Sequence, residues 1–283
     1  MSRYYQIAGH CFLVSGDKLE KAVGDMAAFS PFETSAAKPL FAFIEGNNAP
    51  DMQERLYDFS YEDVNCKFGK TRDGYMLTLH PSSEGRLCLW CDKNEEVSVM
   101  GNYSVRLLRF ALWIGYGLKT LALNTSAIHS SCIVYRNKAI LFLGESGTGK
   151  STHTRLWTEN IAGANLLNDD SPILRYHDNR LWAYGSPWSG KTACYKNEKY
   201  EVIAAVRLSQ GPINKIRKLP VLEAYGALHP SFSPGFAHDD ALYECIGEII
   251  NRVLLNANVY HLECLPDAAA AMTSMNAVFK DRS

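Results

Sequence analysis

One stretch of the chain has the residue types and spacing of a phosphate-binding loop. Residues 144–151 read Gly-Glu-Ser-Gly-Thr-Gly-Lys-Ser, which is the G-x-x-x-x-G-K-S (Walker A) pattern. The apolar run 139–143 precedes it and residues of helical character, 152–157, follow it, so a strand–loop–helix unit is predicted. In such a unit the glycines let the backbone wrap around an anion, and the first N–H groups of the helix point at it. The stretch therefore predicts a site for the phosphates of a nucleotide.

The polar residues of this loop have separate expected roles. Lys150 should reach the β- and γ-phosphates, and the hydroxyl of Ser151 should hold Mg²⁺. The carboxylate of Glu145 is expected to point outward, because an inward carboxylate would repel phosphate. A nucleotide and Mg²⁺ are the cofactors that this chemistry implies. The predicted nucleotide contacts are Gly144, Glu145, Ser146, Gly147, Thr148, Gly149, Lys150, Ser151 and Thr152.

Two adjacent carboxylates, Asp169 and Asp170, follow a short apolar run about 20 residues beyond the loop. Phosphoryl transfer needs an acid to hold the metal and often a base to orient the nucleophile. We expect Asp170 to bind Mg²⁺ together with Ser151, and Asp169 to accept the proton of the nucleophile, although the reverse order is open. The alternative is a solvated turn before Ser171, since aspartate is a common turn residue.

Further polar residues are candidates by type and place. His129 stands at the start of a predicted strand, and two neighbouring strands would bring it near the loop, where it could orient an aspartate. In the run 185–191, Trp188 could stack on a base or pack inward, and Lys191 could meet phosphate. Spacing does not select among three arginines that could stabilise transferred charge, which are Arg155, Arg207 and Arg217.

Composition bounds the class of protein. With 283 residues, 47% hydrophobic content and a net charge of −1, the chain suits one large or two modest globular domains and gives no sign of nucleic-acid binding. No segment approaches the length of about 18 apolar residues that a membrane span requires, and the N-terminus lacks a signal-like pattern, so a cytoplasmic protein is expected. The eight cysteines are scattered, and Cys88 and Cys91 alone are weak support for a metal site.

The alternation of apolar residues predicts two domains. Residues 1–100 are expected to form a β-rich accessory or substrate-recruiting domain, with a first strand over 5–14. Residues 101–283 should form the catalytic domain, reached through a bridging helix over 104–123. The other predicted strands are 41–44, 76–80, 85–91, 128–135, 138–143, 173–176, 181–184, 201–208 and 259–262, and the other predicted helices are 221–228, 239–255 and 268–279.

The runs 128–131, 144–151 and 167–170 resemble, in order and spacing, the catalytic domain of HPr kinase/phosphorylase and the wider set of HPr-kinase-like proteins. The resemblance implies a mixed α/β (α+β) fold: a PEP-carboxykinase-like P-loop catalytic domain with a smaller β-rich N-terminal domain. It implies ATP, Mg²⁺ and transfer to a serine hydroxyl, with His129, Asp169 and Asp170 at the site. The chain has no copy of the Gly-rich arginine motif of that family and has Thr152 where many members have an acid, so phosphorylase activity is not expected.

These observations predict an ATP-dependent, Mg²⁺-assisted kinase that acts on a hydroxyl, such as a serine of a peptide or small protein. The expected catalytic residues are Asp169, His129 and Lys150, and the expected metal ligands are Ser151 and Asp170. The expected partners are a nucleotide and a peptide, protein or small-molecule hydroxyl acceptor, without nucleic acid or membrane, and an oligomer is possible. The alternatives are a regulatory module that binds nucleotide without catalysis and a carboxykinase-like enzyme acting on a small carboxylate.

Overall fold

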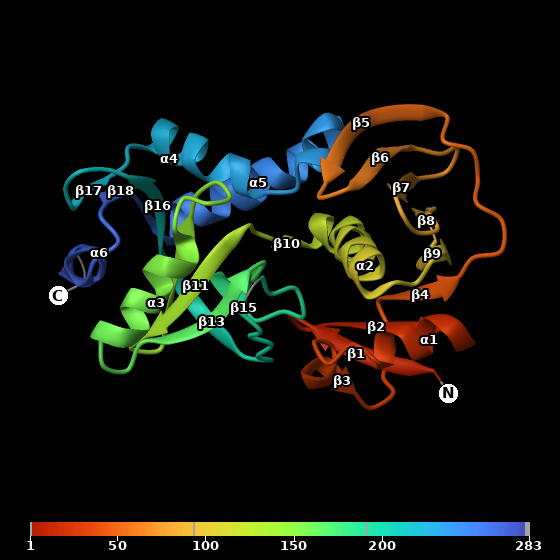
Figure 1. Ribbon diagram of the computed structural model, residues 1–283, viewed down its shortest axis with the longest axis horizontal. Coiled ribbons are helices and arrows are strands. Elements are labelled where there is room, and N and C mark those ends of the chain that lie inside the picture. The colour runs from red at the N-terminus through yellow and green to blue at the C-terminus, as the bar shows by residue number, and fades with distance from the viewer. Residues whose placement is uncertain (1, 93, 191, 281–283) are drawn as a thin grey trace. The chain divides into compact units, whose positions relative to one another are not determined.

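The computed structural model describes residues 2–92, 94–190 and 192–280, and within them the chain is a mixed α/β protein with two sheets (Figure 1). The chain divides into two compact units. Unit 1 holds the residues up to Ala122 together with Gly235–Tyr243, and unit 2 holds Leu123–Pro234 and the residues from Glu244 onward. The division expected at residue 100 therefore lies further along the chain. The mixed α/β class is confirmed, whereas the PEP-carboxykinase-like assignment stays a prediction.

The sheet of unit 1 has nine strands among the described residues, in the order β3-β1-β2-β4-β9-β8-β7-β6-β5. It is mixed, because β2 and β4, and also β4 and β9, run parallel while the other neighbours are antiparallel. Its strands are β1 (Arg3–Ile7), β2 (His10–Ser15), β3 (Glu33–Thr34), β4 (Phe41–Glu45), β5 (Glu54–Tyr61), β6 (Val64–Lys70), β7 (Tyr75–Pro81), β8 (Leu87–Cys91) and β9 (Glu96–Gly101). Its helices include α1 (Asp17–Gly24), α2 (Val105–Thr120) and the 3-10 turn η1 (Ser30–Phe32).

The single strand expected over residues 5–14 is a hairpin of β1 and β2. Ala8 and Gly9 form its turn, with φ angles of 49° and 78°. A two-residue hairpin turn of this kind needs positive φ at both positions, and asparagine or aspartate is the usual first residue. Alanine at such a position gives no turn signal, so the sequence pattern reads as one continuous strand.

Helix α2, the expected bridge over 104–123, belongs to unit 1 and packs on its sheet. A Cβ atom on Gly115 would lie 2.7 Å from the Phe43 ring, so only glycine allows the helix this close to the strands. Tyr116 packs edge-on against Phe12 and Phe41, whose rings stack 5.4 Å apart. Burial of these rings makes the core of unit 1 strongly aromatic.

The segment that returns to unit 1 is fixed by a buried carboxylate. Asp239, which is 4% exposed, accepts hydrogen bonds from the Tyr75 hydroxyl at 2.8 Å and from the backbone N–H of Leu242 at 3.0 Å. Lys70 forms an ion pair with its second oxygen at 2.6 Å. The 3-10 turn η4 (Pro234–His238) leads into this contact. The cluster is closed, since each oxygen of Asp239 has a donor.

The sheet of unit 2 follows the order β10-β14-β15-β16-β12-β11-β13, with β18 beside β16 and β17 beside β18. Strands β12, β16 and β18 run parallel to one another, and the other pairs are antiparallel. The strands are β10 (Thr125–Ala127), β11 (Ser130–Tyr135), β12 (Lys138–Leu143), β13 (Asn165–Asp170), β14 (Ile173–His177), β15 (Arg180–Tyr184), β16 (Lys199–Gln210), β17 (Lys215–Lys218) and β18 (Asn258–Cys264). The helices are α3 (Lys150–Asn160), α4 (Val221–Leu228), α5 (Asp240–Asn256), which begins within unit 1, and α6 (Ala268–Lys280). The 3-10 turn η3 (His229–Ser231) also belongs to unit 2, and the 3-10 turn η2 (Leu121–Leu123) spans the boundary between the two units.

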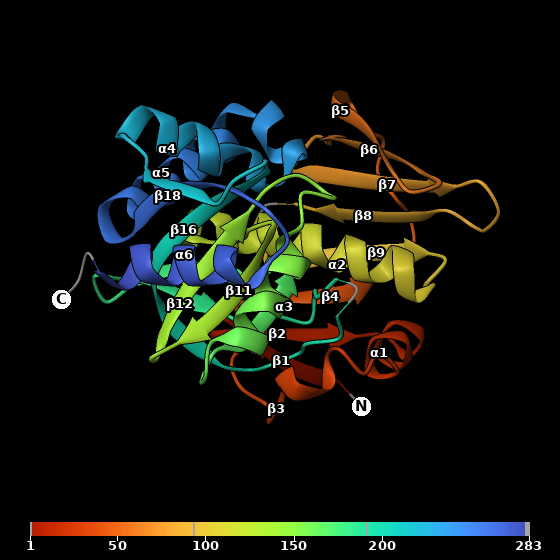
Figure 2. The ribbon, with the colours of Figure 1, turned by 60° about the vertical axis from the view of Figure 1, so that its left-hand side comes forward.

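Helices α3 and α6 lie side by side on one face of this sheet (Figure 2). Their contact includes a buried polar group: Trp157 donates through Nε1 to the Ser274 hydroxyl at 2.9 Å, and His153 Nε2 lies 3.0 Å from the same hydroxyl. Burial lowers the pKa of His153 to about 4, so the ring is neutral near pH 7. His153 is therefore a core residue that fixes α3, the helix that follows the predicted loop.

Most of the expected elements in the second half of the chain are present with small changes in their ends. Strand β12 and helix α4 have the predicted bounds, and the hairpin of β14 and β15 turns at Asp178 and Asn179, both with positive φ. The sequence patterns did not indicate α1, β5, β6, β9 or β17. In the part of the chain that the structure describes, no helix combines the length and apolar character needed to cross a bilayer.

Candidate functional site

The loop at 144–149 connects the end of β12 to the start of α3. Gly147 and Gly149 have φ of 84° and 102°, and a Cβ atom at either position would meet nothing within 4 Å. These glycines are therefore required by the backbone conformation and not by crowding. Thr148 closes the turn, because its N–H and hydroxyl both donate to the carbonyl of Glu145.

Helix α3 begins in this loop with Gly149 as its N-cap residue. No side chain among the described residues caps this end with a hydrogen bond. The first N–H groups of a helix have no partner within the helix, and they carry its partial positive charge. The start of α3 is therefore open to an anionic ligand.

Lys150 is 8% exposed, and its ammonium turns back into the loop. Its Nζ donates to the carbonyls of Gly144 at 2.8 Å and Glu145 at 3.1 Å, and lies 2.9 Å from Nε2 of His129. Burial lowers the pKa of Lys150, against the raising effect of the carboxylates of Asp170 and Asp169. Among the described residues its hydrogen-bond partners are two carbonyls and an imidazole, so the ammonium is a buried cation without a carboxylate in direct contact.

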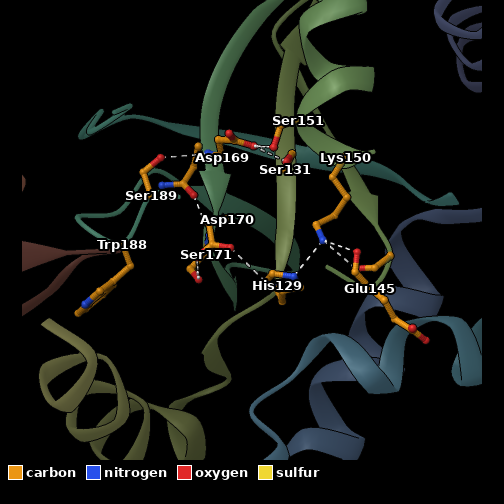
Figure 3. A network of polar contacts seen from close by, with 12 residues as sticks. His129, Ser131, Glu145, Lys150, Ser151, Asp169, Asp170, Ser171, Trp188 and Ser189 are labelled. Atoms are coloured by element: carbon orange, nitrogen blue, oxygen red, sulfur yellow. Dashed lines mark hydrogen bonds and ion pairs between the residues drawn. The ribbon is translucent and has the colours of Figure 1, made fainter. Parts of the chain in front are cut away.

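His129 connects this lysine to a carboxylate. It precedes β11, and its Nδ1 lies 3.2 Å from Oδ1 of Asp170, the last residue of β13. An ammonium can only donate, so Nε2 of His129 accepts from Lys150 and the ring proton sits on Nδ1, facing Asp170. The side chains of His129 and Asp170 are 42% and 40% exposed. Figure 3 shows Lys150, His129 and Asp170 following one another in this order.

The second carboxylate, that of Asp169, contacts Ser131 and Ser151. Strands β11 and β13 are antiparallel, and Ser131 lies opposite Asp169. Oδ1 of Asp169 accepts hydrogen bonds from the hydroxyls of Ser131 at 2.6 Å and Ser151 at 3.0 Å (Figure 3). Both hydroxyls reach the same oxygen, so Oδ2 takes part in neither bond. The sequence pattern assigned Ser131 no role. The signal that could have identified it was its place in the run 128–131, two residues after His129.

The donor set around Ser151 fits a magnesium ion bound with phosphates. Mg²⁺ prefers oxygen ligands and is commonly held by one or two carboxylates together with substrate phosphates and water. The hydroxyl of Ser151 and the carboxylate of Asp169 are ligands of this kind, with Oγ of Ser151 3.0 Å from Oδ1 of Asp169. Among the described residues, no three or more His, Cys, Asp or Glu side chains are grouped so that they could hold a metal ion by themselves. Cys88 and Cys91 of β8 are therefore not part of such a group.

The loop after β15 brackets the end of β13. Asn168 donates to the carbonyl and hydroxyl of Ser186, and Gly190 donates its N–H to the carbonyl of Asp169. Trp188 is 4% exposed and points away from Lys150 and Asp169 in Figure 3, so it packs inward and does not offer a face to a base. The residue Lys191 lies outside the described residues.

The three arginines are separated by the fold. Arg155 is on the outer side of α3, 3.6 Å from Glu159, and Arg217 pairs with Glu223 at 2.6 Å. Arg207 lies next to the loop, with Nη2 3.7 Å from the carboxylate of Glu145. The side chain of Glu145 is 82% exposed, in the outward direction that was expected.

A pocket of about 340 Å³ opens beside this site, between α3 and β13. Its lining includes the expected nucleotide contact Thr152 next to the expected metal ligand Ser151. The lining residues are Ser151, Thr152, Thr154, Arg155, Thr158, Leu166 and Thr192. A space of this size falls within the range of small-molecule sites.

No protein-family model matches the chain, and no curated protein sequence matches it significantly. Among solved structures, the chain is similar to the Hpr(Ser) kinase/phosphatase from Coxiella burnetii, with 14% sequence identity and a TM-score of 0.34. The match covers 56% of this chain and 99% of that one. A likeness of this strength carries no argument about activity, so the function must be argued from the geometry of the site.

Proposed function

We propose that unit 2 is an ATP-dependent phosphotransferase that moves the γ-phosphoryl group to a hydroxyl, such as a serine of a peptide or small protein. The observation that carries the proposal is one connected network. It joins the P-loop ammonium of Lys150 to a carboxylate-oriented imidazole, His129 with Asp170, directly beside the Ser151–Asp169 pair.

The roles of the two acids follow from their partners. Asp169 is 3% exposed and bonds to Ser151, the residue whose hydroxyl holds the metal in P-loop proteins, so Asp169 is assigned to Mg²⁺. Asp170 is exposed and orients His129, so this pair is assigned to the acceptor proton. This is the reverse of the order first expected from the sequence. Bound Mg²⁺ would supply charge neutralisation on the β- and γ-phosphates.

Nucleotide binding at Lys150 would free His129 to act as a base. In the structure it occupies Nε2 of His129, the ring nitrogen that could accept a proton. Phosphate is a stronger partner for an ammonium than a neutral imidazole, so a bound nucleotide would draw Lys150 away. Nε2 is then free to accept the hydroxyl proton, while Asp170 holds Nδ1–H and stabilises the imidazolium.

The test uses ATP binding and ATP turnover as separate readouts, with water as the acceptor where no peptide is known. Asp170→Asn should keep Mg²⁺-dependent ATP binding by calorimetry within about threefold while turnover falls about hundredfold, a typical share for general acid–base catalysis. Asp178→Asn is the matched control, because Asp178 forms a similar exposed pair with His177 at 2.9 Å on a distant turn. Turnover at the wild-type rate in Asp170→Asn would refute the base assignment. Binding without any turnover in the wild type would leave a non-catalytic nucleotide module.

A further inference from the structure

Arg207 is placed at the loop by the parallel pairing of β12 and β16. In that register Arg207 lies opposite Leu143, the residue that precedes the loop. Parallel strands end at the same edge of a sheet, so the side chain of Arg207 enters the region where the loop begins. Farther along β16, the amide of Gln210 reaches the carbonyl of Gly147 at 3.4 Å. The end of β16 therefore follows one side of the loop.

The guanidinium of Arg207 is mostly buried and only partly held. Its Nη1 donates to the carbonyl of Ala227 at the end of α4, at 3.2 Å, and Nη2 lies 3.7 Å from the Glu145 carboxylate. The side chain of Arg207 is 23% exposed, whereas that of Glu145 is 82% exposed. An ion pair with so exposed a carboxylate contributes little, so Glu145 is easily exchanged for another anion.

A second cation beside the loop raises the need for an anion there. The charge of Arg207 is among the causes that lower the pKa of Lys150, after burial, so the two cations act on each other. Like charges placed together are unfavourable until an anion lies between them. In P-loop sites the backbone N–H groups hold the α- and β-phosphates and the lysine reaches the γ-phosphate, which carries the most uncompensated charge.

We propose that Arg207 is a second cationic ligand of the terminal phosphate, and that Glu145 holds its guanidinium in the absence of nucleotide. When a nucleoside triphosphate fills the loop, Arg207 exchanges the Glu145 carboxylate for γ-phosphate oxygens, while Ala227 keeps the other nitrogen in place. An arginine so placed also stabilises charge that develops during transfer. This inference rests on the proposed function and adds a residue that discriminates triphosphate from diphosphate.

The experiment compares the affinities of Mg·ATP and Mg·ADP by calorimetry on the full chain. Arg207→Gln should weaken ATP binding about tenfold or more, the usual effect of losing a hydrogen bond to a charged group, and ADP binding by less than about twofold. Glu145→Gln should strengthen ATP binding, because it removes the competing anion. Arg207→Lys should recover part of the ATP affinity, because it restores the charge without the planar fork.

Arg217→Gln is the control for loss of a positive charge, since Arg217 pairs with Glu223 and has no place in the site. Thermal melting of each variant shows whether loss of the Ala227 bond unfolds the protein, and Glu145→Gln tests the exchange without that risk. An equal loss of ATP and ADP affinity in Arg207→Gln, or an unchanged ATP affinity, would overturn the inference alone. If the wild type binds neither nucleotide, the proposed function itself fails.

Discussion

Lys70 in unit 1 and Lys150 in unit 2 are the same side chain in opposite electrostatic settings. Lys70 forms a 2.6 Å ion pair with the buried carboxylate of Asp239, and this hydrogen bond is the main cause that raises the pKa of Lys70. Lys150 has two carbonyls and the ring of His129 as partners, and burial lowers its pKa.

The contrast separates a cation neutralised within the fold from one that we propose as a phosphate ligand. The Asp239 cluster is complete: burial alone would raise the pKa of Asp239, but its bonds to Lys70, Leu242 and Tyr75 together hold that pKa below its ordinary value. Such a cluster stabilises the fold and offers nothing to a ligand. The ammonium of Lys150 is buried without an adjacent anion, which costs stability and gives a strong preference for one. Four experiments test this contrast.

The largest effect is expected from exchanging each lysine for methionine. Lys150→Met should lower ATP turnover at least about hundredfold, because the charge that meets the phosphates is lost. It should leave the stability of the protein unchanged or raised, since it removes a buried cation. Lys70→Met should do the opposite, with normal turnover and a lower melting temperature, because Asp239 loses its cationic partner. Turnover assays and thermal melts of both variants measure these opposite effects. A loss of both turnover and stability in each variant would contradict the contrast.

His153 in unit 2 and Asp239 in unit 1 should affect stability in different pH windows. The pKa of His153 is lowered from 6.5 to about 4, so the unfolded chain binds a proton between these values that the folded chain does not. Stability should therefore fall as the pH falls from 6.5 towards 4, by up to about 3 kcal/mol. The carboxylate of Asp239 has a pKa below its ordinary 3.8. The stability that it gives unit 1 is therefore complete above pH 3.8 and is lost only as the pH falls further.

Denaturant unfolding at pH 7 and pH 4.5 measures this difference. His153→Gln should lose less stability between the two pH values than the wild type does, because glutamine has no proton to gain. His80, whose pKa burial also lowers, contributes equally to both proteins and cancels in the comparison. An identical loss in wild type and variant would show that His153 is not the titrating group.

The closed cluster of unit 1 should be sensitive to removal of its centre. Asp239→Ala leaves the hydroxyl of Tyr75, the N–H of Leu242 and the ammonium of Lys70 without their acceptor. We expect a loss of about 2 kcal/mol in the free energy of unfolding, measured by chemical denaturation, with ATP binding retained. Asp58→Ala, which breaks the exposed pair with Arg55, is the control and should cost less than about 0.5 kcal/mol. Equal costs for the two changes would remove the distinction drawn for Asp239.

The smallest effect is expected for a change at Ser131, which is not itself a predicted contact of the nucleotide or of Mg²⁺. Its hydroxyl bonds to Asp169 at 2.6 Å and so orients the carboxylate assigned to Mg²⁺. Ser131→Ala should raise the Mg²⁺ concentration needed for half-maximal ATP turnover about tenfold, without altering the rate at saturating Mg²⁺. Tenfold is the lower end of the loss of metal affinity when a metal ligand loses its hydrogen-bond partner. Ser130→Ala is the matched neighbour control, since Ser130 lies opposite Asp170 in the same strand pair. A Mg²⁺ titration with identical midpoints in Ser131→Ala and wild type would contradict the role.

Local signals explain how much of the structure was predictable. The strand β12, the loop and the start of α3 are contiguous, and their conformation depends on glycines at defined positions, so the sequence pattern indicates them directly. The hairpin of β14 and β15 has Asp178 and Asn179 at its turn, which favour the positive φ that the turn requires. The hairpin of β1 and β2 has Ala8 at the same kind of position and could not be recognised by turn chemistry.

The sequence by itself determined the glycine-rich loop between β12 and α3 and supplied two adjacent acids about 20 residues beyond it. Only the tertiary structure decided which side chains each acid contacts. Successive side chains of a strand point to opposite sides, so Asp169 faces Ser131 and Ser151 while Asp170 faces His129. This outcome depends on the register between β11 and β13, in which Ser131 lies opposite Asp169 and a bulge follows at Cys132. A shift of one residue would exchange the sides to which the two acids point, and register is set by packing between distant segments, which no local pattern specifies.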